Sequence, residues 1–206
     1  MRIAIDIDST LHHYWDVLSE AARRRFGIEL PYEEQFNWGI TRLRDEQLTC
    51  CIDETHCDTA ILAGRPYPGA VETVNAWAQQ GHFIHITSHR DPRAHPATER
   101  WLRAIGLRHD ELYCSFDKIT RCTEIGIDLL IDDSPINLQA ALERGIAVAT
   151  IVHPWNQDVC ETEDVVCARD WPELAAKLQP LLEPPTNVEV IKPRRKPRHE
   201  DSADEG

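Results

Sequence analysis

Short apolar segments alternate with longer amphipathic segments along most of the chain. Continuous apolar runs of this length are typical of strands that are buried on both faces of a parallel sheet. Five runs indicate such strands, at 2–7, 82–88, 111–115, 127–133 and 146–152. Helices are indicated between and after them, at 68–81, 95–106, 117–126, 134–145 and 170–182.

Several of these helical segments carry clear start and stop residues. Ser134 followed by Pro135 is typical of a helix start, with Ser134 as the N-cap, and Gly145 is typical of a helix end. Asp170 and Glu173 have the spacing of a capping box. Strands that alternate with helices of this length predict an α/β fold, a Rossmann-like parallel sheet with helices on both faces.

Residues 13–64 interrupt this alternation directly after the first strand. They show no strand pattern; a long helical stretch at 14–26 is followed by shorter helical segments. We therefore expect a small helical cap inserted into a core made of residues 1–12 and 65–182. Residues 183–206 are rich in proline and nearly free of apolar residues towards their end, which predicts a disordered tail.

Charge and composition narrow the classes of function. The 206 residues carry a formal net charge of −13, which argues against binding to a nucleic-acid polymer or an anionic membrane but leaves room for a small phosphorylated ligand. No apolar run reaches the roughly 18 residues of a membrane span, and no secretory signal is indicated, so we expect a cytoplasmic protein. The seven cysteines do not have the spacing of a disulfide framework, and we interpret them as reduced thiols.

Polar residues gather where the predicted strands end, which is where open α/β sheets bind ligands. They are Asp6, Asp8, Thr87, Ser88, Lys118, Asp132 and Asp133. Alternation along a strand places Asp6 and Asp8 on one face, about 7 Å apart along the chain. Such a group of carboxylates is costly in a partly dry crevice unless a cation binds there, and an all-oxygen ligand set favours Mg²⁺. Beside that ion, a hydroxyl and a lysine could hold a phosphoryl group.

The same residues resemble the four ordered motifs of the haloacid dehalogenase-like superfamily. They are "DIDST" at 6–10, Thr87 after an apolar strand, Lys118, and the pair Asp132–Asp133. The resemblance implies that Asp6 attacks phosphorus to form an aspartyl-phosphate and that Asp8 is the general acid and base. It implies that Thr87 and Lys118, with Ser88 beside them, bind the phosphate. It also implies a Mg²⁺ site made by Asp6, the backbone carbonyl of Asp8 and the pair 132–133, either of which could be the direct ligand.

A finer resemblance concerns the branch within this superfamily. The stretches "RPYPGAVETVNAW", "HITS" and "LLIDDSPINL" look most like the cytosolic 5′(3′)-deoxyribonucleotidases (the cytosolic type C 5′-nucleotidases), which have a small cap of the C1 type after the first motif. This resemblance implies a Mg²⁺-dependent phosphomonoester hydrolase that acts on a 5′-nucleotide or a similar small phosphate. The branch usually carries glycine directly after the acid pair, where this chain has Ser9.

Other interpretations of these residues remain open. The chain could be a phosphotransferase that delivers the phosphoryl group to an acceptor other than water, or a non-catalytic binding protein of the same fold. Cys50, Cys51, His56 and Cys57 could form a zinc site, although thiols in the core of the cap fit their spacing better. Side chains that could contact substrate or simply pack or face solvent are His12, His13, His89, Trp15, Phe36 and Trp38.

Overall fold

Six parallel strands form one sheet, in the order β3-β2-β1-β4-β5-β6. The computed structural model describes residues 1–37, 39–162 and 164–183. The strands are β1 (Arg2–Asp6), β2 (Phe83–Ser88), β3 (Glu111–Cys114), β4 (Leu129–Ile131), β5 (Ala147–Ile151) and β6 (Val165–Ala168). The apolar pattern predicts the first five. It does not indicate β6, because this edge strand is short and only Ala168 of its four residues is buried.

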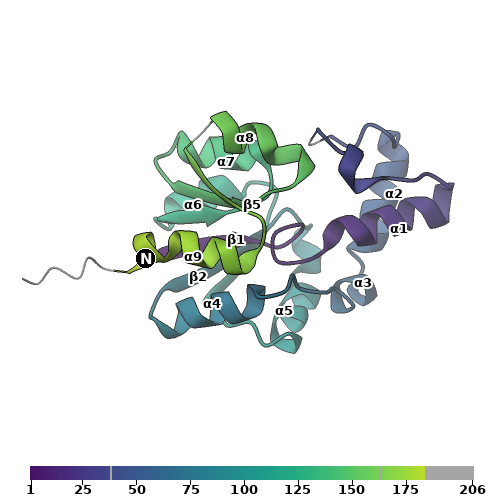
Figure 1. Cartoon of the computed structure of the whole chain (residues 1–206). Helices are drawn as coiled ribbons and strands as arrows, with labels where there is room; N and C mark the ends of the chain where they lie inside the picture. Colours follow the sequence, from purple (N-terminus) through teal and green to yellow (C-terminus); the bar gives the residue numbers. More distant parts are fainter. Residues whose placement is uncertain (38, 163, 184–206) are drawn as a thin grey trace, which may run out of the picture.

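Helices cover both faces of the sheet (Figure 1). One face packs against α4 (Ala70–Gln79), α5 (His95–Ala104) and α9 (Trp171–Leu182). The other packs against α6 (Lys118–Glu124), α7 (Pro135–Leu142) and α8 (Gln157–Thr162). Within β1, Ile3 and Ile5 join the first core and Ala4 joins the second, as strand alternation requires. The predicted fold class is confirmed.

The two predicted N-caps are confirmed, whereas the predicted capping box is only half formed. Ser134 is the N-cap of α7, where its side chain accepts a hydrogen bond from the backbone amide of Asn137. Asp170 caps α9 by accepting from the amide of Glu173 at 2.9 Å. The Glu173 carboxylate reaches back to the amide of Arg169, one residue further than in a capping box. Three short 3₁₀ helices complete the secondary structure: η1 (Tyr32–Glu34), η2 (Pro92–Ala94) and η3 (Pro154–Asn156).

A helical insert follows β1 and lies beyond the carboxyl end of that strand (Figure 1). Its helices are α1 (Tyr14–Phe26), α2 (Asp45–Thr55) and α3 (Asp58–Leu62), and we call this insert the cap. It has an apolar core of its own, formed mainly by Trp15, Leu18, Ala21, Ala22, Leu30, Leu43 and Cys51. The chain enters and leaves the cap side by side, since the amide of His13 donates to the carbonyl of Arg65 at 3.1 Å.

The interpretation of all seven cysteines as reduced thiols is wrong for two of them. Cys160 and Cys167 form a disulfide between α8 and β6, with their Cα atoms 5.9 Å apart. The packing of α8 against β6 brings the two residues within bonding range, which the spacing along the sequence does not reveal. The other five cysteines are free; in the cap, Cys51 is buried as expected, whereas Cys50 is half-buried and Cys57 is exposed.

Two expectations fall outside the described part of the chain. These are the role of Trp38 and the disordered tail, of which only Glu183 is described. Among the described helices, none has both the length and the apolar character needed to cross a membrane.

The fold predicts how two apolar side chains differ in their contribution to stability. Leu130 is fully buried in the central strand β4, whereas Ile136 on α7 is 62% exposed. Leu130→Ala should lower the free energy of unfolding by about 2–5 kcal/mol because it leaves a cavity in the core. Ile136→Ala should change it by less than about 0.5 kcal/mol. Urea unfolding measures both values, and equal losses in the two variants would contradict the packing described here.

Candidate active site

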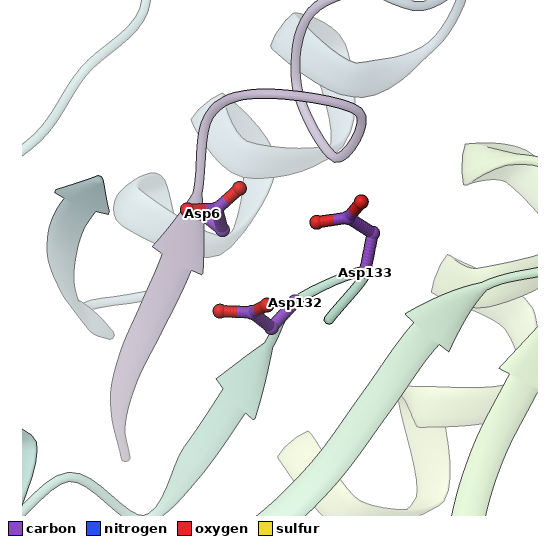
Figure 2. A group of neighbouring side chains, drawn as sticks. All are labelled: Asp6, Asp132 and Asp133. Carbon is purple, nitrogen blue, oxygen red and sulfur yellow. The ribbon is translucent and has the colours of Figure 1, made fainter. Parts of the chain in front are cut away.

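Three carboxylates converge at the carboxyl edge of the sheet (Figure 2). Asp6 is the last residue of β1, and Asp132 and Asp133 directly follow the neighbouring strand β4. Each residue offers an oxygen, and these oxygens lie within 4.8 Å of one another. All three side chains are buried. The structure therefore brings together the acids that the motifs place 126 positions apart along the sequence, from Asp6 to Asp132.

Lys118 supplies a buried positive charge between two of these carboxylates. It is the first residue of α6, on the face of the sheet towards which Asp6 points, and it is 2% exposed. Its Nζ lies 2.6 Å from Asp6 Oδ1 and 2.6 Å from Asp132 Oδ2. Burial alone would lower the pKa of Lys118, but Asp132 and Asp6 outweigh burial and raise it, so the lysine stays charged.

Asp132 and Asp133 also accept hydrogen bonds from the segments that follow β4 and β5. Asp132 Oδ1 accepts from the amide of Ser134 at 2.9 Å and from Asn137 Nδ2 at 3.1 Å, both at the start of α7. Asp133 Oδ2 accepts from Trp155 Nε1 at 3.2 Å. Burial, with Asp6 and Asp132 nearby, raises the pKa of Asp133 well above its ordinary value.

Asp8 lies outside this group and has a cation of its own. Arg90 donates from Nη2 to Asp8 Oδ1 at 2.7 Å and from Nε to Oδ2 at 3.0 Å, which is a bidentate pair. Arg90 is 1% exposed and also donates to Thr98 Oγ1 at 3.2 Å. Burial alone would raise the pKa of Asp8, but Arg90 and His56 hold it well below its ordinary range. The side chain of Asp8 is therefore ionised and paired.

The two hydroxyl residues of β2 have different neighbours. Thr87 pairs in register with Asp6 across the sheet, and its Oγ1 is buried without a hydrogen-bond partner among the described residues. An unpaired hydroxyl in that position suits a ligand oxygen bound beside Asp6. Ser88 Oγ instead lies 3.5 Å from Asp8 Oδ2 and accepts from the amide of Arg90 at 3.3 Å. Ser88 is thus placed beside Asp8, and its role in binding phosphate stays a prediction.

The charges of the three-carboxylate group suit a divalent cation. When all three carboxylates are ionised, they and the single ammonium of Lys118 sum to −3 + 1 = −2. Burial raises the pKa of Asp6 to about 7; Lys118 opposes this rise and Asp132 adds to it. A divalent ion bound by these oxygens would offset the two uncompensated charges, and an all-oxygen ligand set is the one that Mg²⁺ prefers. Both Asp132 and Asp133 belong to the group that could hold the ion. The backbone carbonyl of Asp8 as a further Mg²⁺ ligand stays a prediction.

A pocket of about 420 Å³ lies between this group and the cap. Its floor is polar and includes Asp6, Asp8, Lys118, Asp132 and Asp133. Its roof comes from the cap and is largely apolar, with Tyr14, Trp15, Leu18, Ile40, Leu48 and Ile52. Phe116, which is 72% exposed, and His89 also line it. With a divalent cation bound at this acidic floor, the pocket suits a small molecule that is anionic at one end and apolar or aromatic at the other.

The structure decides between the other interpretations of the cap cysteines and of the candidate substrate contacts. Among the described residues, only Asp6, Asp132 and Asp133 are grouped closely enough to hold a metal, so the zinc interpretation of Cys50, Cys51, His56 and Cys57 has no support. His56 is instead placed in the pocket, with Nε2 3.6 Å from Asp8 Oδ2. Of the other candidates, His89 and Trp15 line the pocket, whereas His12, His13 and Phe36 do not.

Sequence reasoning missed three residues that support the site, and one of them is Asn137, which donates to Asp132. Arg90, which pairs with Asp8, lies two residues beyond the end of β2, and no pattern distinguishes it from the other arginines of the chain. Trp155, which donates to Asp133, follows β5 by four residues. Because Arg90 and Trp155 each follow a strand at the ligand-binding edge, their place in the sequence indicates that they could lie near the site. The sequence does not indicate which acid each of them would bind.

Ser9 occupies the position at which the branch that this chain resembles usually has glycine, and it adopts a backbone conformation that favours glycine. Its φ is +63°, in the left-handed region that favours glycine, and it is the only non-glycine residue with positive φ in the described part of the chain. The turn is held by backbone hydrogen bonds from Ser9 N to His12 O at 2.9 Å and from Leu11 N to Ile7 O at 2.8 Å. The chain therefore keeps the turn that glycine would allow and accepts backbone strain at Ser9.

Comparison with known proteins identifies the fold. The structure aligns with a HAD family hydrolase from Deinococcus radiodurans solved with bound phosphate and sodium, with a TM-score of 0.65 and 18% identity, over 88% of this chain and 96% of that one. It aligns with CbbY from Rhodobacter sphaeroides in complex with phosphate, with a TM-score of 0.61 and 15% identity, over 86% and 98%. The chain has the haloacid dehalogenase-like fold. At these identities the likeness establishes the fold alone.

One sequence relative carries a functional name. A Bacillus cereus protein called "Putative nucleotidase" is 23% identical over 172 residues, which cover 76% of this chain and 89% of that protein. No family model matches the sequence. In the haloacid dehalogenase-like fold, the buried group of Asp6, Asp132 and Asp133 lies at the expected edge of the sheet, and the cap covers it.

The strain at Ser9 predicts a difference between two small substitutions. Ser9→Gly removes the Cβ that disfavours positive φ, whereas Ser9→Ala keeps it and also removes the hydroxyl. The Gly variant should therefore be more stable than the Ala variant by about 1 kcal/mol. Urea unfolding of the two variants measures this difference. An Ala variant as stable as the Gly variant would show that the turn is not strained.

The buried Asp6 predicts a pH-dependent change in stability. Its pKa is about 7 in the folded protein and 3.8 ordinarily, so between these values the folded state holds a proton that the unfolded state has lost. The stability contributed through Asp6 therefore falls as the pH rises through this window. In EDTA, Asp6→Asn should gain stability relative to wild type between about pH 4.5 and about pH 7.5, by at most about 4 kcal/mol.

Urea unfolding of both proteins at both pH values checks this expectation. The comparison with the variant isolates the part of the pH dependence that depends on Asp6. A difference between wild type and variant that stays constant with pH would show that Asp6 is ionised throughout. Adding Mg²⁺ at the higher pH should stabilise wild type more than Asp6→Asn, since the variant loses one charged ligand.

Proposed function

We propose that this protein is a Mg²⁺-dependent phosphomonoester hydrolase that acts through a phospho-Asp6 intermediate. The observation that carries the proposal is the buried group of Asp6, Asp132 and Asp133 with Lys118 between its members, at the bottom of a pocket closed by the cap. Solved structures of the same fold hold phosphate, which supports a phosphorylated substrate.

Asp6 is the residue best placed to attack the substrate. Lys118 holds its Oδ1, so Oδ2 is the oxygen that attacks phosphorus, forming a P–O bond as the bond to the leaving oxygen breaks. Lys118 and the unpaired hydroxyl of Thr87 bind the phosphoryl oxygens and stabilise the charge that spreads over them. Asp6 and the 132–133 pair would hold Mg²⁺, which would supply further neutralisation of that charge.

Asp8 transfers the protons in this proposal. As general acid it gives a proton to the leaving oxygen, and as general base it takes one from the water that hydrolyses phospho-Asp6. The Arg90 pair keeps Asp8 ionised, which favours the second role. The first role requires Asp8 to bind a proton as its contact with Arg90 loosens.

The substrate that we propose is a 5′-nucleotide or a similar small phosphate. The apolar and aromatic roof of the pocket, with Trp15 and Tyr14 from the cap, suits a nucleoside better than a short polar acid. The name of the Bacillus cereus relative and the resemblance to the 5′(3′)-deoxyribonucleotidases support the same class.

Turnover of p-nitrophenyl phosphate tests the reaction. Wild type should hydrolyse it in Mg²⁺ and not in EDTA, and Asp6→Asn should lose activity by several orders of magnitude because the nucleophile is absent. Glu20→Gln, an exposed change on the outer side of α1, is the control that should keep full activity. Equal, Mg²⁺-independent rates in wild type and Asp6→Asn would exclude the proposal.

A panel of nucleoside monophosphates and sugar phosphates then tests the substrate class. A preference for nucleoside monophosphates supports the nucleotidase assignment. Phosphoryl transfer to an added alcohol or sugar, rather than release of phosphate, would instead identify a phosphotransferase that uses the same site.

A further inference from the structure

The cap and the core meet in an aromatic cluster beside the pocket, and two of its members, Trp15 and Trp155, line the pocket wall. Tyr32 lies in η1 of the cap, and His153 and Trp155 lie in the core segment after β5. Trp155 packs against Trp15 with ring centres 5.4 Å apart, and Tyr32 meets Trp155 edge-on at 5.7 Å. Neither Tyr32 nor His153 lines the pocket. Their contacts therefore need an explanation other than substrate binding.

His153 joins the cap to the turn that follows Asp8. Its Nε2 lies 2.7 Å from the carbonyl oxygen of Ser9, and its Nδ1 lies 2.7 Å from the hydroxyl of Tyr32. A carbonyl can only accept, so Nε2 carries the hydrogen. Burial lowers the pKa of His153 to about 4, so the ring is neutral and its Nδ1 accepts from Tyr32. One ring thus transmits a directed pair of hydrogen bonds from Tyr32 to Ser9.

The core holds this ring firmly. His153 stacks on Trp155 with ring centres 4.5 Å apart and planes 3° from parallel. The backbone amide of His153 donates to Asn156 Oδ1 at 2.8 Å, and Asn156 in turn donates to the carbonyl of Asp133 at 3.2 Å. The ring is therefore fixed with respect to the acid group, and the bonds to Ser9 and Tyr32 are the contacts that reach outward from it.

The hydrogen bond from His153 reaches a turn whose conformation affects the position of Asp8. This turn is strained, with φ of +63° at Ser9, and it directly follows Asp8. Two side chains of the core donate to its carbonyls: His153 to Ser9 and Trp171 Nε1 to Thr10 at 2.9 Å. Of these two donors, only His153 also bonds to the cap among the described residues. A change at Tyr32 can thus reach the turn through a single side chain.

We propose that Tyr32 and His153 form a latch through which the closed cap fixes the Ser9 turn and thereby positions Asp8. Both are positioning residues, since neither touches the pocket. The effect on catalysis rests on the proposed phosphatase function, whereas the effect on the turn does not. Loss of the Tyr32 hydroxyl should loosen residues 9–12, which belong to the core, although the change is made in the cap.

Hydrogen exchange tests the structural part without any substrate. The amides of Ser9, Thr10, Leu11 and His12 are hydrogen-bonded within the turn, so their exchange reports its opening. Tyr32→Phe keeps the ring and deletes the hydroxyl, and it should speed exchange at 9–12 about three- to tenfold. Tyr67→Phe is the matched control. Tyr67 also packs on His153, at 6.3 Å, but its hydroxyl has no hydrogen-bond partner among the described residues.

The exchange experiment has two decisive outcomes. Faster exchange at residues 9–12 in Tyr32→Phe, with wild-type exchange in Tyr67→Phe, supports the latch. Equal exchange at these amides in the two variants overturns it. Both substitutions keep an aromatic ring in place, so the result does not depend on a variant that fails to fold.

Kinetics test the catalytic part with p-nitrophenyl phosphate in Mg²⁺. Tyr32→Phe should lower kcat about three- to tenfold with a smaller change in KM, because the turn beside Asp8 is affected and the pocket wall is not. In a His153→Gln background the same change should have no further effect, since the path is already broken. Additive losses in the double variant would overturn the latch. Wild type that does not hydrolyse p-nitrophenyl phosphate would contradict the proposed function. If exchange at residues 9–12 is still faster in Tyr32→Phe, the latch is supported independently of that function.

Discussion

Four carboxylates at one edge of a sheet would repel one another, and the way in which they are separated organises the whole site. Asp6 and Asp132 share the ammonium of Lys118, whereas Asp8 is paired with the guanidinium of Arg90. Each cation is buried and comes from a different element, α6 in one case and the segment after β2 in the other. Asp6 and Asp8, two positions apart in the sequence, thus belong to two electrostatic groups, one left with excess negative charge and one neutral.

This separation assigns different chemistry to the two acids. The excess charge around Asp6 suits a divalent cation and a phosphoryl group, while the neutral Asp8 pair suits a residue that exchanges protons only when its partner moves. The strained turn at Ser9 connects the two groups to the cap. A cap that contacts this turn through His153 can influence Asp8 without touching the substrate.

Much of the fold and part of the site could be predicted from local pattern. Apolar runs indicated β1 to β5, and the motifs correctly brought Asp6, Lys118, Asp132 and Asp133 to one edge. The short, half-exposed β6 lacked that signal. The Cys160–Cys167 disulfide and the Arg90–Asp8 pair were not foreseen either, because both join residues whose proximity depends on how separate elements pack. The positions of the arginines along the sequence carry no sign that Arg90 is the one buried beside Asp8.

The sequence by itself determined the alternation of strands and helices, the inserted cap and the residues that each strand delivers to the ligand-binding edge. These properties follow from hydrophobic period and from the geometry of parallel sheets, which are local. Only the tertiary structure decided the partner of each charge and the bond from Tyr32 through His153 to the turn at Ser9. Those features depend on distances between segments far apart in the chain, and no spacing along the sequence encodes them.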